Sequence, residues 1–291
     1  MSSTETPAVG DGPQYKLFLR GTLILMALLV VARFVLEVAG TPQSVARFIS
    51  STAAMVLAGI YLGAIAPLRG LKKVVQLILP AIVVTAWTIA WVILATVISG
   101  AASLQNSHFA EKEDWGNWAH LGRHLVGHLI EVPIVSLLLF IFMLIPFLLW
   151  RWPVIVAPAA VLGGLVVMRF WMEAMGVEAW RAAAWSSTVG IVIAAFYLGG
   201  MGPRLGATTA LQLLAPSLAL AWTWRFWVFL ATLFGALAPF FKTHFFDPSG
   251  GRIAVRLASF FLFGTLIEGL VAGLIVWGIA VWISRATRAT E

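Results

Sequence analysis

Long apolar stretches alternate with short polar segments along almost the whole chain. Each stretch has about 20 residues or more, the length that an α-helix needs to cross the hydrocarbon core of a bilayer. Charged residues, Pro or Gly bound each stretch, and no alternation of polar and apolar residues predicts a strand. The pattern therefore predicts an all-α integral membrane protein with eight transmembrane helices, at about residues 17–38, 45–66, 72–99, 119–149, 153–176, 181–201, 210–237 and 253–284.

The composition supports this class and excludes several others. Hydrophobic residues make up 61% of the 291 residues and charged residues only 11%, whereas about a quarter of the residues in a soluble domain are charged. The 14 Trp residues suit aromatic belts at the two membrane interfaces. The chain has no Cys, which excludes thiol catalysis and thiolate metal sites. The net charge of +7 is spread over short loops, so no nucleic-acid partner is predicted.

Basic residues in the loops predict the orientation. An even number of helices puts both chain ends on one side, and that side carries most of the loop Lys and Arg residues, among them Arg69, Lys72 and Lys73. The positive-inside rule therefore places both termini in the cytoplasm. We expect an integral protein of a bacterial cytoplasmic (inner) membrane, with residues 1–15 as a disordered cytoplasmic tail.

The chain repeats itself at a fixed spacing. The segment RFVLEVAG at Arg33 returns as RFWMEAMG at Arg169, and YLGAIAPLRG at Tyr61 returns as YLGGMGPRLG at Tyr197, both 136 residues later. Self-similarity at a fixed period indicates a duplicated structural unit. We predict two four-helix repeats, residues 16–150 and 151–291. Four helices per unit insert both units in the same direction, related by a pseudo-twofold axis along the membrane normal.

Charged residues recur at membrane depth in both predicted repeats. Arg33 and Glu37 are four residues apart, as are Arg169 and Glu173, and this spacing allows an ion pair along one helix face. One interpretation is an interfacial pair that fixes the helix ends. The other is the lining of a polar ligand site.

A second carboxylate also recurs. Glu131 and Glu268 lie about 12 residues inside their predicted helices, with apolar sequence after them. An ionisable residue inside a membrane is a functional candidate, and at about 1.5 Å per residue both carboxylates lie well below the predicted interface. The alternative is a structural hydrogen bond between helices. Ser51 and Ser187 open the second and sixth helices, where Ser either caps a helix or joins a polar site.

Three histidines precede Glu131 on one helical face. His120, His124 and His128 are spaced by four residues, and they could bind a metal ion, relay protons or form a hydrated interfacial stripe. The second repeat has Leu257, Phe261 and Thr265 at the corresponding positions, so any such role belongs to the first half. No cofactor is firmly implied, although a metal ion on the stripe stays an alternative.

These observations favour a carrier or channel-like protein for a small solute, ion or proton, with a polar site between the two repeats. One alternative is a non-catalytic subunit of a larger membrane complex, and another is an intramembrane metal or haem protein that uses the histidines. No catalytic motif is present, and we do not expect an enzyme. The expected partners are membrane lipids and, in the first alternative, other membrane subunits. The candidate binding residues are Arg33, Glu37, Ser51, Glu131, Arg169, Glu173, Ser187 and Glu268, with His120, His124 and His128 as proton-relay or metal candidates.

Overall fold

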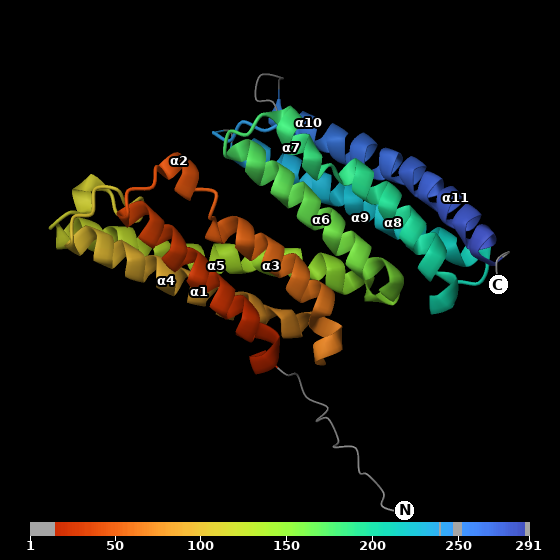
Figure 1. Ribbon diagram of the computed structural model, residues 1–291, viewed down its shortest axis with the longest axis horizontal. Helices are drawn as coiled ribbons and strands as arrows, with labels where there is room; N and C mark the ends of the chain where they lie inside the picture. Colours follow the sequence, from red (N-terminus) through yellow and green to blue (C-terminus); the bar gives the residue numbers. More distant parts are fainter. Residues whose placement is uncertain (1–14, 239, 247–251, 289–291) are drawn as a thin grey trace, which may run out of the picture.

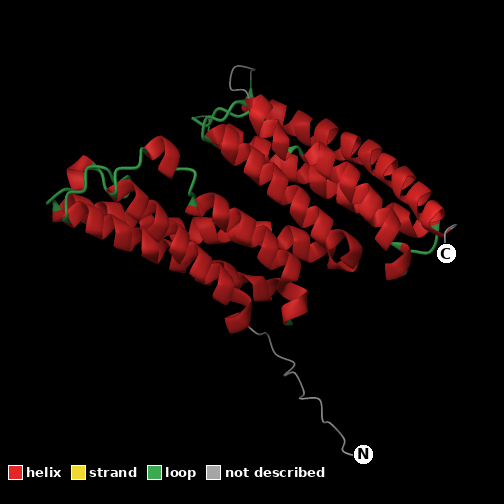
Figure 2. Ribbon diagram, in the orientation of Figure 1, coloured by secondary structure: helices red, strands yellow, loops and turns green. Residues whose placement is uncertain are grey.

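The structure is a computed structural model that describes residues 15–238, 240–246 and 252–288. Across these ranges the chain forms helices and loops without a strand (Figure 2). The α-helices are α1 (Tyr15–Val38), α2 (Gln43–Ala46), α3 (Ser51–Ile65), α4 (Ile78–Ala101), α5 (Trp118–Leu148), α6 (Pro153–Ala174), α7 (Ala179–Ala182), α8 (Ser187–Met201), α9 (Ala210–Leu237), α10 (Ile253–Ser259) and α11 (Glu268–Arg288). A π-helical segment, Phe260–Ile267, joins α10 to α11. Short 3₁₀ turns are Ala66–Arg69, Val74–Leu77, Lys112–Asp114, Leu149–Arg151, Ala183–Trp185 and Pro203–Leu205.

Eight helical segments in the described part of the chain are long and apolar enough to cross a membrane. They are Tyr15–Val38, Gln43–Arg69, Val74–Ala101, Trp118–Arg151, Pro153–Ala174, Ala179–Met201, Ala210–Leu237 and Ile253–Thr287. The eight predicted helices are confirmed, to within a few residues at their ends, as segments long and apolar enough to span a membrane. The predicted tail, residues 1–15, lies outside the described residues except for Tyr15, which begins α1.

The helices form two groups that follow the order of the chain (Figure 1). In the first half, α1 packs on α3 and α4, and α5 packs on α3 and α4. In the second half, α6 packs on α8 and α9, and α11 packs on α8 and α9. Contacts between the halves run mainly through α3 and α6.

A buried hydrophobic cluster lies at the junction between the halves. Trp227 on α9 donates its indole N–H to the carbonyl oxygen of Ala159 on α6 at 3.2 Å. The Trp227 ring stacks on Phe142 of α5, with 5.8 Å between the ring centroids. A buried Trp is stable when its indole N–H has a hydrogen-bond acceptor, so Trp227 stabilises the contact between the halves. The cluster consists of Ile60, Phe142, Val166, Trp227 and Ala231.

Glycines allow close helix packing at equivalent positions of the two halves. A Cβ atom on Gly63 would overlap the carbonyl group of Met143, where α3 crosses α5. A Cβ atom on Gly199 would lie 2.7 Å from the carbonyl oxygen of Ala280, where α8 crosses α11. Small residues let membrane helices approach closely enough for backbone contact.

Candidate functional site

The first buried charge cluster lies at the end of α1. Glu37 is completely buried, and its Oε1 accepts a hydrogen bond from Arg33 Nε at 3.1 Å. Its Oε2 accepts the backbone N–H of His108 at 3.0 Å and the ring Nδ1–H of the same residue at 2.6 Å. These contacts satisfy a carboxylate that would otherwise be costly to bury. They also fasten the loop before α5 to α1.

The second half contains the same arrangement. Glu173 at the end of α6 accepts from Arg169 Nε at 3.2 Å, from the backbone N–H of His244 at 2.7 Å and from its ring Nδ1–H at 2.6 Å. Each carboxylate and its histidine are 71 residues apart in the sequence. We call each set a carboxylate clamp: Arg33, Glu37 and His108 in the first half, and Arg169, Glu173 and His244 in the second.

The predicted Arg–Glu ion pairs are therefore confirmed, but sequence reasoning missed the histidine in each clamp. His108 and His244 lie in loops, and their shared spacing of 136 residues was the signal that could have found them. Burial lowers the pKa of His108 below its ordinary value, and the hydrogen bond to Glu37 offsets only part of this effect. His108 is therefore favoured in its neutral form, with its proton on Nδ1.

The histidine stripe has a second supporting carboxylate. Asp114 is buried in the loop before α5, and its two oxygens contact His120 Nδ1 at 2.7 Å and His124 Nδ1 at 2.8 Å. The backbone N–H of Glu111 also donates to Asp114, at 2.8 Å. Burial alone would raise the pKa of Asp114, but these hydrogen bonds outweigh it and lower the pKa. Asp114 was not among the predicted residues, because no regular spacing links it to the histidines.

The third histidine of the stripe bonds to Glu131. The ring Nδ1 of His128 lies 3.2 Å from Glu131 Oε2. The side chains of Glu131 and Glu268 are 56% and 61% exposed. Among the described residues, the buried carboxylates are Glu37, Asp114 and Glu173. Glu131 faces a cavity, whereas Glu268 lies on the surface beside Arg225.

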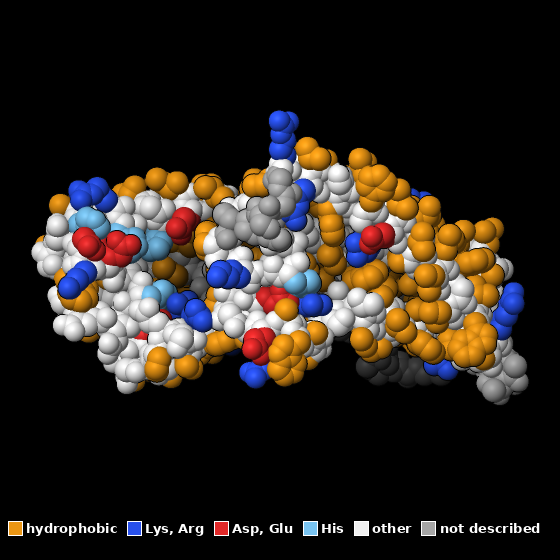
Figure 3. Space-filling view, turned by 90° about the horizontal axis from the view of Figure 1, so that it is seen from above, with side chains coloured by type: hydrophobic (Ala, Val, Ile, Leu, Met, Phe, Trp, Pro, Cys, Tyr) orange, Lys and Arg blue, Asp and Glu red, His pale blue; other side chains and the backbone are white. Residues whose placement is uncertain are grey.

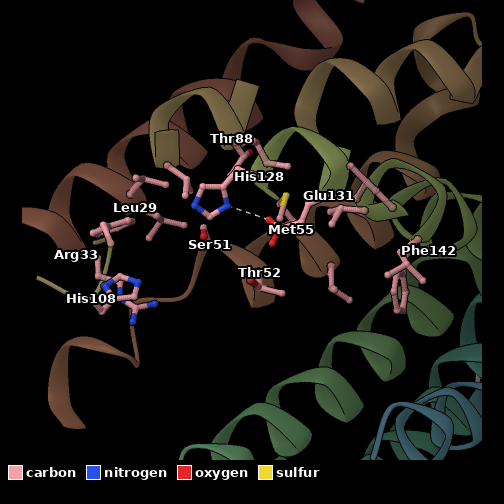
Figure 4. Close-up of a pocket in the computed structure, with 18 of the residues that line it drawn as sticks. Leu29, Arg33, Ser51, Thr52, Met55, Thr88, His108, His128, Glu131 and Phe142 are labelled. Atoms are coloured by element: carbon pink, nitrogen blue, oxygen red, sulfur yellow. Dashed lines mark hydrogen bonds and ion pairs between the residues drawn. The ribbon is translucent and has the colours of Figure 1, made fainter. Parts of the chain in front are cut away.

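A polar cavity of about 320 Å³ lies mainly among the helices of the first half, and Phe234 of α9 is also part of its lining. Figure 4 shows Arg33 and His108 toward one end and Phe142 at the other, with His128 and Glu131 between them. Histidine and acidic side chains also gather on the surface of the first half in the view from above (Figure 3). The polar lining residues are Arg33, Ser51, Thr52, Thr88, His108, His124, His128 and Glu131. His120 is not part of this lining, so only His124 and His128 of the stripe reach the cavity.

The second half fills the corresponding positions with large side chains. Trp224 and Arg225 stand 136 residues after Thr88 and Ile89 of the polar cavity. Trp224 Nε1 donates to Ser187 Oγ at 2.9 Å. The candidate Ser187 is thus bound to an indole, whereas its counterpart Ser51 faces the cavity.

Arg225 joins α9 to the π-helical segment. Its Nε donates to the carbonyl oxygen of Gly264 at 2.6 Å, and its guanidinium pairs with Glu268. A π-helix leaves backbone carbonyls without their usual α-helical partner, so Arg225 stabilises this segment. Its guanidinium also lies 5.4 Å from the Trp224 ring centroid.

A second cavity, of about 250 Å³, lies at the junction of the halves. Its lining is almost entirely apolar and comes from α3, α5, α6 and α9, together with residues that follow α9. We expected a polar site between the halves. The structure places the polar cavity mainly within the first half, with Phe234 of α9 in its lining, and an apolar cavity at the junction.

The residues could hold a metal ion only if three or more ligands converged. Across the described ranges, no group of three or more His, Asp or Glu side chains is arranged in that way. His120 and His124 both contact Asp114, whereas His128 contacts Glu131. The geometry does not support the metal alternative.

The comparisons with known proteins assign no family. No protein-family model, curated protein or solved structure matches the chain. The residues of the site are therefore what indicates the function.

Proposed function

We propose that the protein is a carrier or channel-like membrane protein for a small cation or a proton, and that the polar cavity of the first half is its binding site. Eight apolar helices provide the membrane body. The two clamps and the matching helix contacts support a fold of two parallel four-helix repeats. In this proposal the first repeat binds the solute and the second supports it.

The carboxylate of Glu131 is the observation that carries the proposal. Arg33 is the only Lys or Arg in the described lining of the polar cavity, and its Nε is already bound to Glu37. The partner of Glu131 is His128, which is uncharged unless it is protonated. The cavity thus carries negative charge without a basic side chain to neutralise it. A cation or a proton supplies the missing positive charge.

Flux into proteoliposomes tests this function. The full chain is reconstituted, and uptake of radiolabelled methylammonium is measured beside proton entry reported by a trapped pH-sensitive dye. Glu131→Gln keeps the side-chain shape and removes the charge. We expect uptake to fall by about tenfold or more, because the loss of one charge contact weakens binding by at least that factor. Glu268→Gln is the matched control, because Glu268 lies outside the cavity, and it should leave uptake unchanged.

Two results would overturn the proposal. One is equal loss in Glu131→Gln and Glu268→Gln, which would remove the link to the cavity. The other is a wild-type protein that admits neither probe faster than protein-free vesicles do. If that inactive protein also co-purified with a fixed set of membrane proteins, the subunit alternative would replace the carrier.

A further inference from the structure

The polar and apolar cavities are neighbours that meet at four common lining residues. Thr52, Val56, Phe142 and Phe234 line both of them. Apart from these common residues, the polar cavity is lined by histidines and Glu131, and the apolar cavity by side chains such as Phe170, Trp171 and Leu230. A single ligand that occupied both cavities would need a polar end and an apolar end.

The hydrogen bonds of the histidines define the polar end. A carboxylate accepts hydrogen bonds and cannot donate them, so the Nδ1 atoms of His108, His124 and His128 carry their protons toward Glu37, Asp114 and Glu131 respectively. In a neutral imidazole the other nitrogen, Nε2, is then an acceptor. The cavity therefore presents imidazole acceptors and a carboxylate, which suit a headgroup that donates hydrogen bonds.

The aromatic residues common to both cavities suit the same headgroup. Phe142 and Phe234 stack with 5.9 Å between their ring centroids and an angle of 17° between the rings. Aromatic faces attract cations, and the rings also continue into the apolar cavity. An ammonium group at Glu131 would thus meet acceptors on one side and aromatic rings on the other.

We propose that the ligand is an amphipathic amine, with its ammonium group in the polar cavity beside Glu131 and a single hydrocarbon tail in the apolar cavity at the junction. The inference rests on the proposed function and names the substrate class of that site. A carboxylate headgroup would be repelled by Glu131. An alcohol could donate a hydrogen bond but would leave the charge of Glu131 unbalanced.

Neighbouring residues on α3 provide a matched pair of variants. Ala53 lines the apolar cavity at the junction, whereas Ala54 lines a different cavity between α1 and α3. Ala53→Phe would fill the space for the tail and leave the polar cavity open. Ala54→Phe adds the same side chain one residue later and leaves both parts of the proposed site unchanged.

Competition binding tests the inference on the full chain in lipid nanodiscs. Saturable binding of radiolabelled octylamine is measured by scintillation proximity, with unlabelled methylamine, octanol and octanoate as competitors. Each buried methylene adds about fourfold in affinity at most, so octylamine should bind roughly tenfold or more tightly than methylamine. Octanol and octanoate should compete more weakly than octylamine. Ala53→Phe should weaken octylamine by about tenfold or more while methylamine binding and Ala54→Phe stay at wild-type values.

The outcomes separate this inference from the proposed function. If methylamine binds and Glu131→Gln abolishes its binding, but octylamine binds no more tightly and Ala53→Phe has no effect, the amphipathic ligand is wrong and the small-cation site stands. If octanoate competes best, the ligand is an anion and both proposals fail. If neither amine binds saturably, both also fail.

Discussion

The two halves of the molecule share their carboxylate clamps and differ in what lies beside them. In both halves a buried carboxylate holds an Arg four residues earlier and a loop His 71 residues later, with distances that agree within 0.3 Å. A polar cavity adjoins the clamp of the first half. In the second half, Trp224 and Arg225 occupy the corresponding positions of α9. The clamps, which the two halves share, are therefore best explained as structural elements. The polar cavity, where the halves differ, is best explained as the functional element.

The recurring carboxylates Glu131 and Glu268 show the same division. Glu131 faces the cavity and contacts His128, whereas Glu268 pairs with Arg225 beside the π-helical segment. Equal position in two copies of a sequence does not give equal chemistry, because the neighbouring helices supply different partners. The comparison leads to three experiments.

Loss of the clamp carboxylates should have the largest effect. Glu37→Ala and Glu173→Ala each leave a buried or half-buried Arg and His without their acceptor, which costs about 3 kcal/mol or more in a buried network. We expect both variants to lose thermal stability to a similar extent, measured by circular dichroism in detergent.

The control for the clamp variants is an exposed ion pair. Glu178 pairs with Arg181 on the surface, and such pairs contribute little, so Glu178→Ala should leave the unfolding temperature almost unchanged. If Glu37→Ala were much milder than Glu173→Ala, the clamps would not be equivalent supports. The conclusion that both halves rely on the same structural support would then be wrong.

Exchange of one residue between the halves should have the next largest effect. Thr88→Trp places in the first half the residue that stands at the equivalent position of the second half, Trp224. The indole would occupy the polar cavity, and methylammonium uptake should fall by about tenfold or more because the displaced ligand contacts are lost.

Trp224→Thr is the reciprocal change. It removes the donor to Ser187 but does not touch the polar cavity, so uptake should stay at the wild-type rate. Equal loss in the two variants would show that the solute path involves both halves to the same degree.

The helices could be predicted from the sequence and the site only in part. Hydropathy is a local property, and the eight spans follow from it. The Arg33–Glu37 pair is also local, since the residues are one helical turn apart. The contact of Glu37 with His108 depends on where a loop 71 residues away returns to α1, and no local pattern encodes that. The partner of Glu268 likewise depends on how α9 packs on the π-helical segment.

Acidification should have the smallest effect, and it tests the histidine of the first clamp. Because burial lowers the pKa of His108 below 6.5 in the folded protein, the unfolded state binds a proton more readily, and stability falls as the pH drops through 6.5 toward the folded pKa. His108→Asn keeps a donor for Glu37 and removes the titration. Its unfolding temperature should therefore decrease less than that of the wild type between about pH 7.5 and about pH 5.5. If His244→Asn reduced this sensitivity by as much, the pH response would belong to both clamps and the difference between the halves would be confined to the cavity.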